Sequence, residues 1–87
     1  MDFRLRFGTN LRRLRESAGL SQEDLMRISD VHRTQISKYE RGETEPQVAA
    51  LVRLSRALGV STEEFFTGVG WQEDPPRLTV EPTESLS

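Results

Sequence analysis

Apolar residues recur at helical spacing along the chain, beginning close to the N-terminus. In residues 2–17, steps of three and four residues place the apolar positions on one face, which predicts a first amphipathic helix. Gly19 is placed to end this helix, and Leu20 supplies the apolar contact that often accompanies such an end. The apolar face consists of Phe3, Phe7, Leu11, Leu14 and Ala18.

A second helix is predicted over residues 22–29. Ser21 is a favourable N-cap, and Asp24 stands three residues later, where the acid of a capping box reaches back to the cap. Leu25 and Ile28 then recur at helical spacing within the segment.

A tight turn separates this helix from a third, predicted over residues 33–41. Asp30 suits the turn, because Asp is one of the few residues besides glycine that adopt left-handed backbone readily. Gly42 is placed to close the third helix. Ile36 and Tyr39 are expected to face inward. The outward positions are polar or basic: Arg33, Thr34, Ser37, Lys38 and Arg41.

An exposed helix face of basic and short polar side chains is suited to contact base edges in the major groove of DNA. Two short helices joined by a tight turn, with such a face on the second, predict a DNA-binding helix-turn-helix. His32 directly precedes the third helix and is interpreted as its cap, with a possible phosphate contact when protonated.

A fourth helix is predicted over residues 47–58, because Pro46 suits a helix start and Gly59 a helix end. Its small residues, Ala50 and Ala57, suit close packing. The apolar face consists of Val48, Leu51, Leu54 and Leu58.

Ser61 and Glu64 match the S-x-x-E pattern of a capping box and predict a fifth helix. Phe65 and Phe66 would point to different sides of it, so only one of them can face the core fully. The predicted fold is therefore an all-α domain of five helices over residues 1–68, followed by a short C-terminal tail.

The tail, residues 69–87, has a different composition, with helix-breaking glycines and prolines and several acids. One interpretation is a disordered acidic segment that can bind a partner protein. The other is a small β-hairpin packed on the domain or on a second copy of the chain, since an isolated two-stranded ribbon is only marginally stable. Phe66, Val69 and Trp71 either form a dimer surface or cover the core of their own chain.

The charge distribution modifies this picture. The net charge is −2, but residues 72–87 contain four acids and one base, so residues 1–71 contain eleven bases and ten acids. Positions 3–15 contain five arginines and no acid, although a solvated helix face explains most of them. Because net charge governs non-specific attraction to DNA, we expect weak non-specific affinity.

Composition argues against several other classes. There is no cysteine and one histidine, so we expect no metal site and no cofactor. An enzyme is not expected either, because there is no Gly-rich phosphate loop and no pair of acids in an apolar pocket. No apolar run approaches the ~20 residues that a membrane helix needs, and the N-terminus is too charged for a signal peptide. We therefore expect a cytoplasmic location without membrane contact.

The chain from about Phe7 to Phe66 resembles the Cro and phage-repressor helix-turn-helix family, also called XRE-like regulators. The resemblance is carried by residues 8–15, by Gly-Leu-Ser-Gln at 19–22, by Ile36-Ser37 with Glu-Arg-Gly at 40–42, and by Leu-Gly-Val-Ser at 58–61. It implies a compact domain of five helices that binds operator DNA as a homodimer.

The resemblance also implies residue roles. Gln22 matches a position that contacts a phosphate. Arg33 and Thr34 match base-contacting positions, and Ser37 and Lys38 match positions that reach bases or nearby phosphates. The last implied DNA contact is Arg41, to the backbone. Arg15 and Glu40 match a pair that ties the first helix to the recognition helix.

Three departures from the family pattern stand out. Met26 occupies a position that is usually alanine, where the two motif helices cross. Asp30 replaces a turn glycine. Residues 43–45, Glu-Thr-Glu, stand where many members place Arg, Lys or Asn against phosphate, which puts a backbone contact from this loop in doubt.

Three functional hypotheses follow. The first is a transcriptional regulator that binds a pseudo-palindromic operator as a dimer. The second is the antitoxin or controller of a two-gene module, whose acidic tail binds a partner protein. The third is a protein with the same fold that has lost DNA binding and acts through protein contacts alone.

Overall fold

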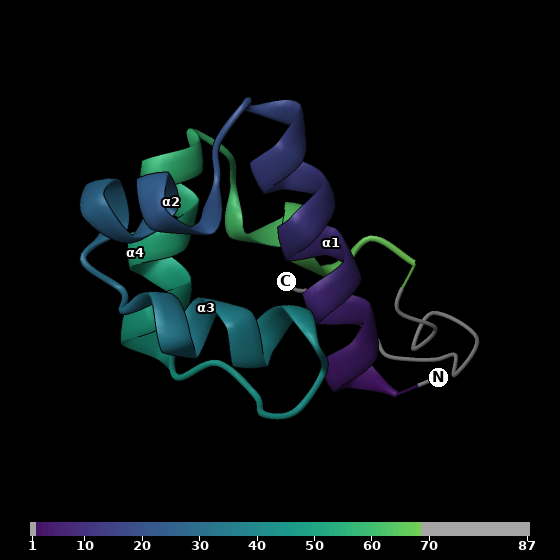
Figure 1. The fold of residues 1–87 in the computed structure, drawn as a ribbon. Coiled ribbons are helices and arrows are strands. Elements are labelled where there is room, and N and C mark those ends of the chain that lie inside the picture. The colour runs from purple at the N-terminus through teal and green to yellow at the C-terminus, as the bar shows by residue number, and fades with distance from the viewer. Residues whose placement is uncertain (1, 69–87) are drawn as a thin grey trace.

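The computed structural model describes residues 2–68 of the chain, and in that range it is all-helical. The elements are α1 (Phe3–Ser17), α2 (Gln22–Ser29), α3 (Arg33–Glu40), α4 (Val48–Leu58) and the 3-10 helix η1 (Thr62–Phe66). The four α-helices surround a shared core: α1 packs on α3 and η1, and α2 packs on α3 and α4 (Figure 1). The tail that was predicted as a hairpin or acidic segment lies outside the described residues.

The core is built from side chains of every element. Phe7 is at its centre, with its ring centroid 5.6 Å from that of Tyr39 on α3 and 5.4 Å from that of Phe65 on η1. Fully burying an apolar side chain of this size contributes about 1.5–3 kcal/mol. The buried apolar residues are Phe7, Leu11, Leu25, Val31, Ile36, Tyr39, Leu54 and Phe65.

The helix boundaries follow the predicted signals closely. Ser21 and Asp24 form the expected capping box, because each side chain accepts a hydrogen bond of 3.0 Å from the backbone N–H of the other. Asp30 adopts left-handed backbone at φ 63° and ends α2. Met26, the departure at the crossing of the motif helices, is half-buried against the core.

Three apolar positions that helical spacing placed with the core are exposed instead: Ala18, Ile28 and Val48. The side chain of Ile28 is 56% exposed and that of Val48 is 77% exposed. The buried residues of α2 are Leu25 and Ser29, so the buried face continues four residues after Leu25 and does not include Ile28, which is three residues after it. Val48 is the first residue of α4 and extends past the end of the core. A periodic pattern defines a face, but the extent of the neighbouring elements decides how much of that face is buried.

The predicted fifth α-helix is a 3-10 helix of five residues. The Ser61 hydroxyl accepts from the backbone N–H of Glu63 at 3.1 Å, and not from Glu64 as a capping box would require. The buried Asn10 amide donates to the carbonyls of Phe65 at 2.8 Å and Thr67 at 2.9 Å. These long-range hydrogen bonds hold the end of η1 against α1.

None of the helices in residues 2–68 is long and apolar enough to cross a membrane.

Candidate nucleic-acid interface

α3 crosses α1 at very close range, and Gly8 makes this approach possible. A Cβ atom added at Gly8 would lie 2.2 Å from the Tyr39 carbonyl oxygen and 3.0 Å from that of Glu40. Only glycine therefore fits at this point. The local sequence pattern does not indicate this role of Gly8. The available signal was a glycine inside a predicted helix, which costs about 1 kcal/mol relative to alanine and so needs a reason.

A polar network then fixes the orientation of α3. The Arg15 guanidinium donates to both oxygens of the Glu40 carboxylate, from Nε at 2.7 Å and from Nη2 at 3.0 Å. Its Nη1 donates to the Leu20 carbonyl at 2.8 Å, and Gln22 Nε2 donates to Glu40 Oε1 at 3.1 Å. The network joins α1, the start of α2 and the end of α3, so the predicted Arg15 and Glu40 pair is present.

This network is largely shielded from solvent. The side chains of Arg15 and Glu40 are 11% and 5% exposed. Hydrogen bonding to Glu40 raises the pKa of Arg15 above its ordinary value, against the opposing effect of burial. A bidentate pair of this kind is directional, so it constrains the angle between two helices as well as their separation.

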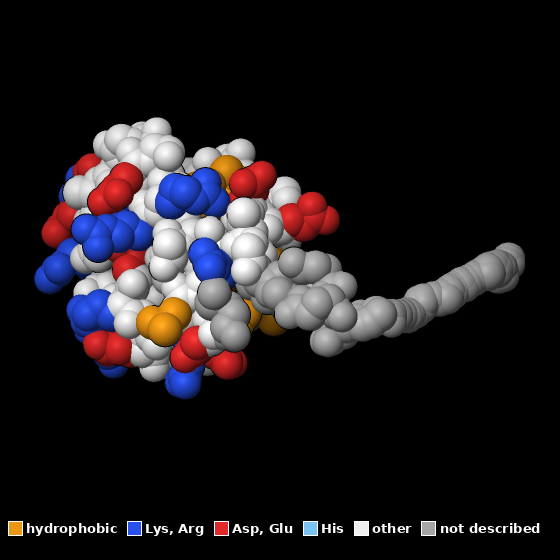
Figure 2. Space-filling view, turned by 90° about the vertical axis from the view of Figure 1, so that its right-hand side faces the viewer, with side chains coloured by type: hydrophobic (Ala, Val, Ile, Leu, Met, Phe, Trp, Pro, Cys, Tyr) orange, Lys and Arg blue, Asp and Glu red, His pale blue; other side chains and the backbone are white. Residues whose placement is uncertain are grey.

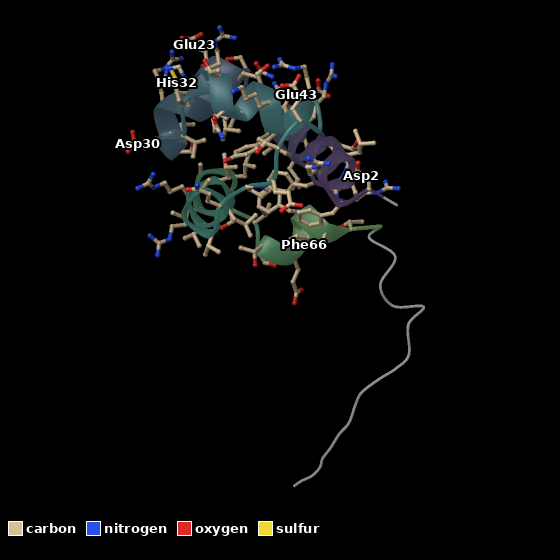
Figure 3. The ribbon with its side chains drawn as sticks, turned by 90° about the horizontal axis from the view of Figure 1, so that it is seen from below. Asp2, Glu23, Asp30, His32, Glu43 and Phe66 are labelled. Carbon is tan, nitrogen blue, oxygen red and sulfur yellow. The ribbon has the colours of Figure 1, made fainter. Side chains whose placement is uncertain are left out.

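Four of the residues predicted to contact DNA lie in α3, and His32 and Arg41 are the caps at its two ends. Arg33, Thr34 and Lys38 are exposed, whereas Ser37 is half-buried. His32 Nδ1 accepts from the Thr34 backbone N–H at 3.1 Å, so the ring caps the helix as predicted. In Figure 3, His32 lies at the start of α3 and Glu43 just beyond its end.

Gln22, predicted to contact a phosphate, belongs to the network around Glu40. Its amide is engaged with Glu40, as described, but an amide NH2 group has two hydrogens, so one remains available to an acceptor. Gln22 is also the first residue of α2, where backbone N–H groups favour anions. The residue can therefore take part in the network and still face a phosphate.

Two acids lie beside arginines that are predicted to contact DNA, and the sequence pattern did not indicate these ion pairs. Glu23 Oε1 lies 3.8 Å from Arg33 Nε, and the Glu43 carboxylate lies 2.6 Å from Arg41 Nε. Both acids are labelled in Figure 3, at opposite ends of α3. The acidic loop after α3 put a contact with the DNA backbone in doubt. In the structure, Glu43 of this loop is paired with Arg41, the residue predicted to make a backbone contact.

The face of the molecule formed largely by α1 is not a basic patch. Figure 2 shows basic side chains interspersed with acidic ones over this face. Arg12 Nε lies 3.2 Å from Glu16 Oε2, and Arg4 Nε lies 3.9 Å from Asp2 Oδ1. Arg4, Arg12 and Arg13 are exposed and match the interpretation as a solvated helix face, whereas Arg6 is half-buried and Arg15 belongs to the network with Glu40.

The residues considered for a dimer surface are only partly described. The Phe66 ring stacks on that of Phe3 with centroids 5.6 Å apart and is half-buried. Val69 and Trp71 lie outside the described residues.

Comparison with known proteins gives a consistent result. The model of the family described as helix-turn-helix matches residues 11–65, which contain α2, α3 and the whole of α4. The chain is 42% identical over 67 residues to the uncharacterized HTH-type transcriptional regulator y4dJ of Sinorhizobium fredii, covering 77% of this chain and 87% of that protein. It is 39% identical to the control protein C.BamHI of Bacillus amyloliquefaciens, covering 79% of this chain and 89% of the relative.

Solved structures include similar folds. The restriction-modification controller protein C.AhdI of Aeromonas hydrophila matches with a TM-score of 0.70 at 35% identity, covering 72% of this chain and 96% of the controller. Sequence, fold and the arrangement of α2 and α3 agree, and the chain belongs to the helix-turn-helix family.

Proposed function

We propose that this protein is a sequence-specific DNA-binding transcriptional regulator that inserts α3 into the major groove. The observation that carries the proposal is the division of α3 into two faces. Ile36 and Tyr39 are buried, and Glu40 joins the shielded network, while Arg33 and Lys38 remain exposed. The helix is thus anchored from one side and presents basic side chains on the other.

Within this proposal the contact residues have distinct roles. Arg33 and Thr34 stand in the first turn of α3 and contact base edges. A cation in the first turn opposes the helix dipole, so a functional reason for Arg33 is favoured over a structural one. Lys38 and Ser37 contact bases or phosphates one turn later. Gln22 contacts a phosphate from the start of α2.

We further propose that the protein binds as a homodimer on a pseudo-palindromic operator. Helix-turn-helix dimers place their reading helices about 34 Å apart, one turn of the duplex. Phe66 is a candidate for the dimer surface together with Val69 and Trp71. In Figure 3 it lies on the side of the molecule away from His32 and Glu23, so a dimer contact there would leave α3 accessible.

Selection of bound duplexes from a random DNA pool, at two salt concentrations, tests the proposal directly. It yields the site, its symmetry and the number of phosphates engaged. Arg33→Ala should then cost about 1–3 kcal/mol on the selected site and relax the preference at one base position. Gln22→Ala should instead weaken binding to all sequences alike. Unchanged affinity and preference in Arg33→Ala would show that α3 does not read the groove.

A second candidate function is that of a controller in a two-gene module. It is favoured by similarity over most of the chain to proteins named as control proteins, among them C.BamHI and C.AhdI. Binding to the DNA upstream of the protein's own gene, measured with and without a competing random duplex, tests this role. A partner protein that binds the acidic tail would be detected by comparing the full chain with a chain truncated after Gly70.

A further inference from the structure

The guanidinium of Arg41 has all three of its nitrogens engaged within the protein. Nε lies 2.6 Å from Glu43 Oε2, and Nη2 donates to Glu43 Oε1 at 3.2 Å. Nη1 donates to the Ser37 hydroxyl. Arg41, one of the residues predicted to contact DNA, is thereby bound to the acid that follows α3 and to a second predicted contact residue, Ser37.

The backbone holds this acid in place. Gly42 adopts left-handed backbone at φ 74°, and its N–H donates to the Tyr39 carbonyl at 3.0 Å. The N–H of Glu43 donates to the Lys38 carbonyl, also at 3.0 Å. These two bonds form a Schellman motif, which fixes the residue after the glycine close to the last turn of the helix. The position of Glu43 beside Arg41 is therefore set by the helix end.

The charges around Glu43 reinforce the pairing. Hydrogen bonding to Arg41, with added attraction from Arg41 and Lys38, lowers the pKa of Glu43 below its ordinary value, so the acid is ionised at neutral pH. By contrast, Lys38 makes no ion pair within the described part of the chain, and Arg33 meets Glu23 only at 3.8 Å. Arg41 is thus the predicted contact residue that an acid engages most fully.

A carboxylate and a phosphate present the same chemistry to arginine, two oxygens that accept from the planar guanidinium fork. We propose that Glu43 is an internal competitor for the DNA backbone: its carboxylate occupies Arg41 in place of a phosphate and lowers affinity for duplexes of any sequence. The inference rests on the proposed function. Its consequence is that binding depends more heavily on the base contacts of Arg33 and Thr34.

The test compares two acids of the same loop. Glu43→Gln removes the competing carboxylate. Glu45→Gln removes the same charge two residues away, at an exposed side chain that forms no ion pair with Arg or Lys in residues 2–68. Dissociation constants are measured over a series of salt concentrations on the selected operator and on a scrambled duplex. Thermal unfolding checks that each variant is folded.

Glu43→Gln is expected to bind both duplexes about fivefold more tightly, which corresponds to the upper end of the free energies measured for exposed ion pairs. The dependence of affinity on salt concentration should become steeper by the amount expected for about one more phosphate contact. Glu45→Gln is expected to change affinity less than twofold. In an Arg41→Gln background, Glu43→Gln is expected to lose its effect, because no cation remains to be released.

Two results would overturn the inference and leave the proposed function standing. One is an equal gain in Glu43→Gln and Glu45→Gln, which would reveal a general charge effect. The other is a gain that survives in the Arg41→Gln background. Failure of both the parent and Glu43→Gln to select any duplex would instead remove the proposed function together with the inference.

Discussion

The inner and outer sides of α3 both carry charged pairs, but their surroundings differ. On the inner side, Arg15 and Glu40 are 11% and 5% exposed and join a network that includes Gln22. On the outer side, Arg41 and Glu43 are 54% and 49% exposed and join no buried group. The geometry of both pairs is bidentate, so solvent exposure is the main difference between them.

This difference separates a structural role from an exchangeable one. Removing one partner of a buried pair leaves an uncompensated charge and typically costs about 3–5 kcal/mol. An exposed pair contributes about 0–1 kcal/mol, so its partners can be exchanged for other groups at little cost. The inner pair therefore fixes the position of α3, whereas the outer pair is the one that a phosphate can displace in our proposal.

The largest effect is expected where α1 and α3 touch. Gly8→Ala would place a methyl group 2.2 Å from the Tyr39 carbonyl, and the two helices would have to separate. We expect a loss of about 3 kcal/mol in the free energy of unfolding, measured by urea denaturation. Thr9→Ala, at an exposed position of the same helix, is the matched control and should change stability by less than about 0.5 kcal/mol. Equal stability of both variants would contradict the close crossing.

The next effect concerns the inner pair. Arg15→Leu leaves the Glu40 carboxylate shielded without its main partner. We expect a loss of about 2–3 kcal/mol in unfolding free energy, less than for a fully unpaired carboxylate, because Gln22 still donates to Glu40. The double variant Arg15→Leu with Glu40→Leu should recover much of this stability, because it removes both charges. Operator affinity should be lower than that of the parent in both the single and the double variant, because the orientation of α3 is no longer constrained. Full recovery of both properties would show that the pair has no positioning role.

The smallest effect is expected at the exposed start of α2. Ser21→Ala removes one hydrogen bond of the capping box and should cost about 1 kcal/mol, measured by thermal unfolding. Hydrogen bonds from Ser21 lower the pKa of Asp24 below its ordinary value. Because the folded-state pKa is lowered, this contribution is present above the ordinary pKa of Asp and is lost as pH falls through the lowered value. Ser21→Ala keeps the larger effect, that of the backbone N–H of residue 21, and removes the effect of the side chain, so the variant should lose slightly less stability on acidification than the parent does.

Local signals predicted helix boundaries well, because a cap or a turn residue acts on its own neighbours. Ser21, Asp30 and Gly42 each mark a helix end that the structure contains. Predictions that depended on the extent of the core were less accurate. Ile28 and Val48 fit a helical period and yet are exposed, and the chain after Ser61 winds as a 3-10 helix.

The succession of helices, the turn at Asp30 and the polar outer side of α3 could be predicted from the chain alone, since these depend on spacing and on the conformational preferences of single residues. Only the tertiary structure placed Gly8 under the Tyr39 carbonyl, brought Gln22 to Glu40, and closed the Glu43 carboxylate on Arg41. The reason is physical: packing and ion pairing depend on distances between side chains, and those distances are set when separate helices meet.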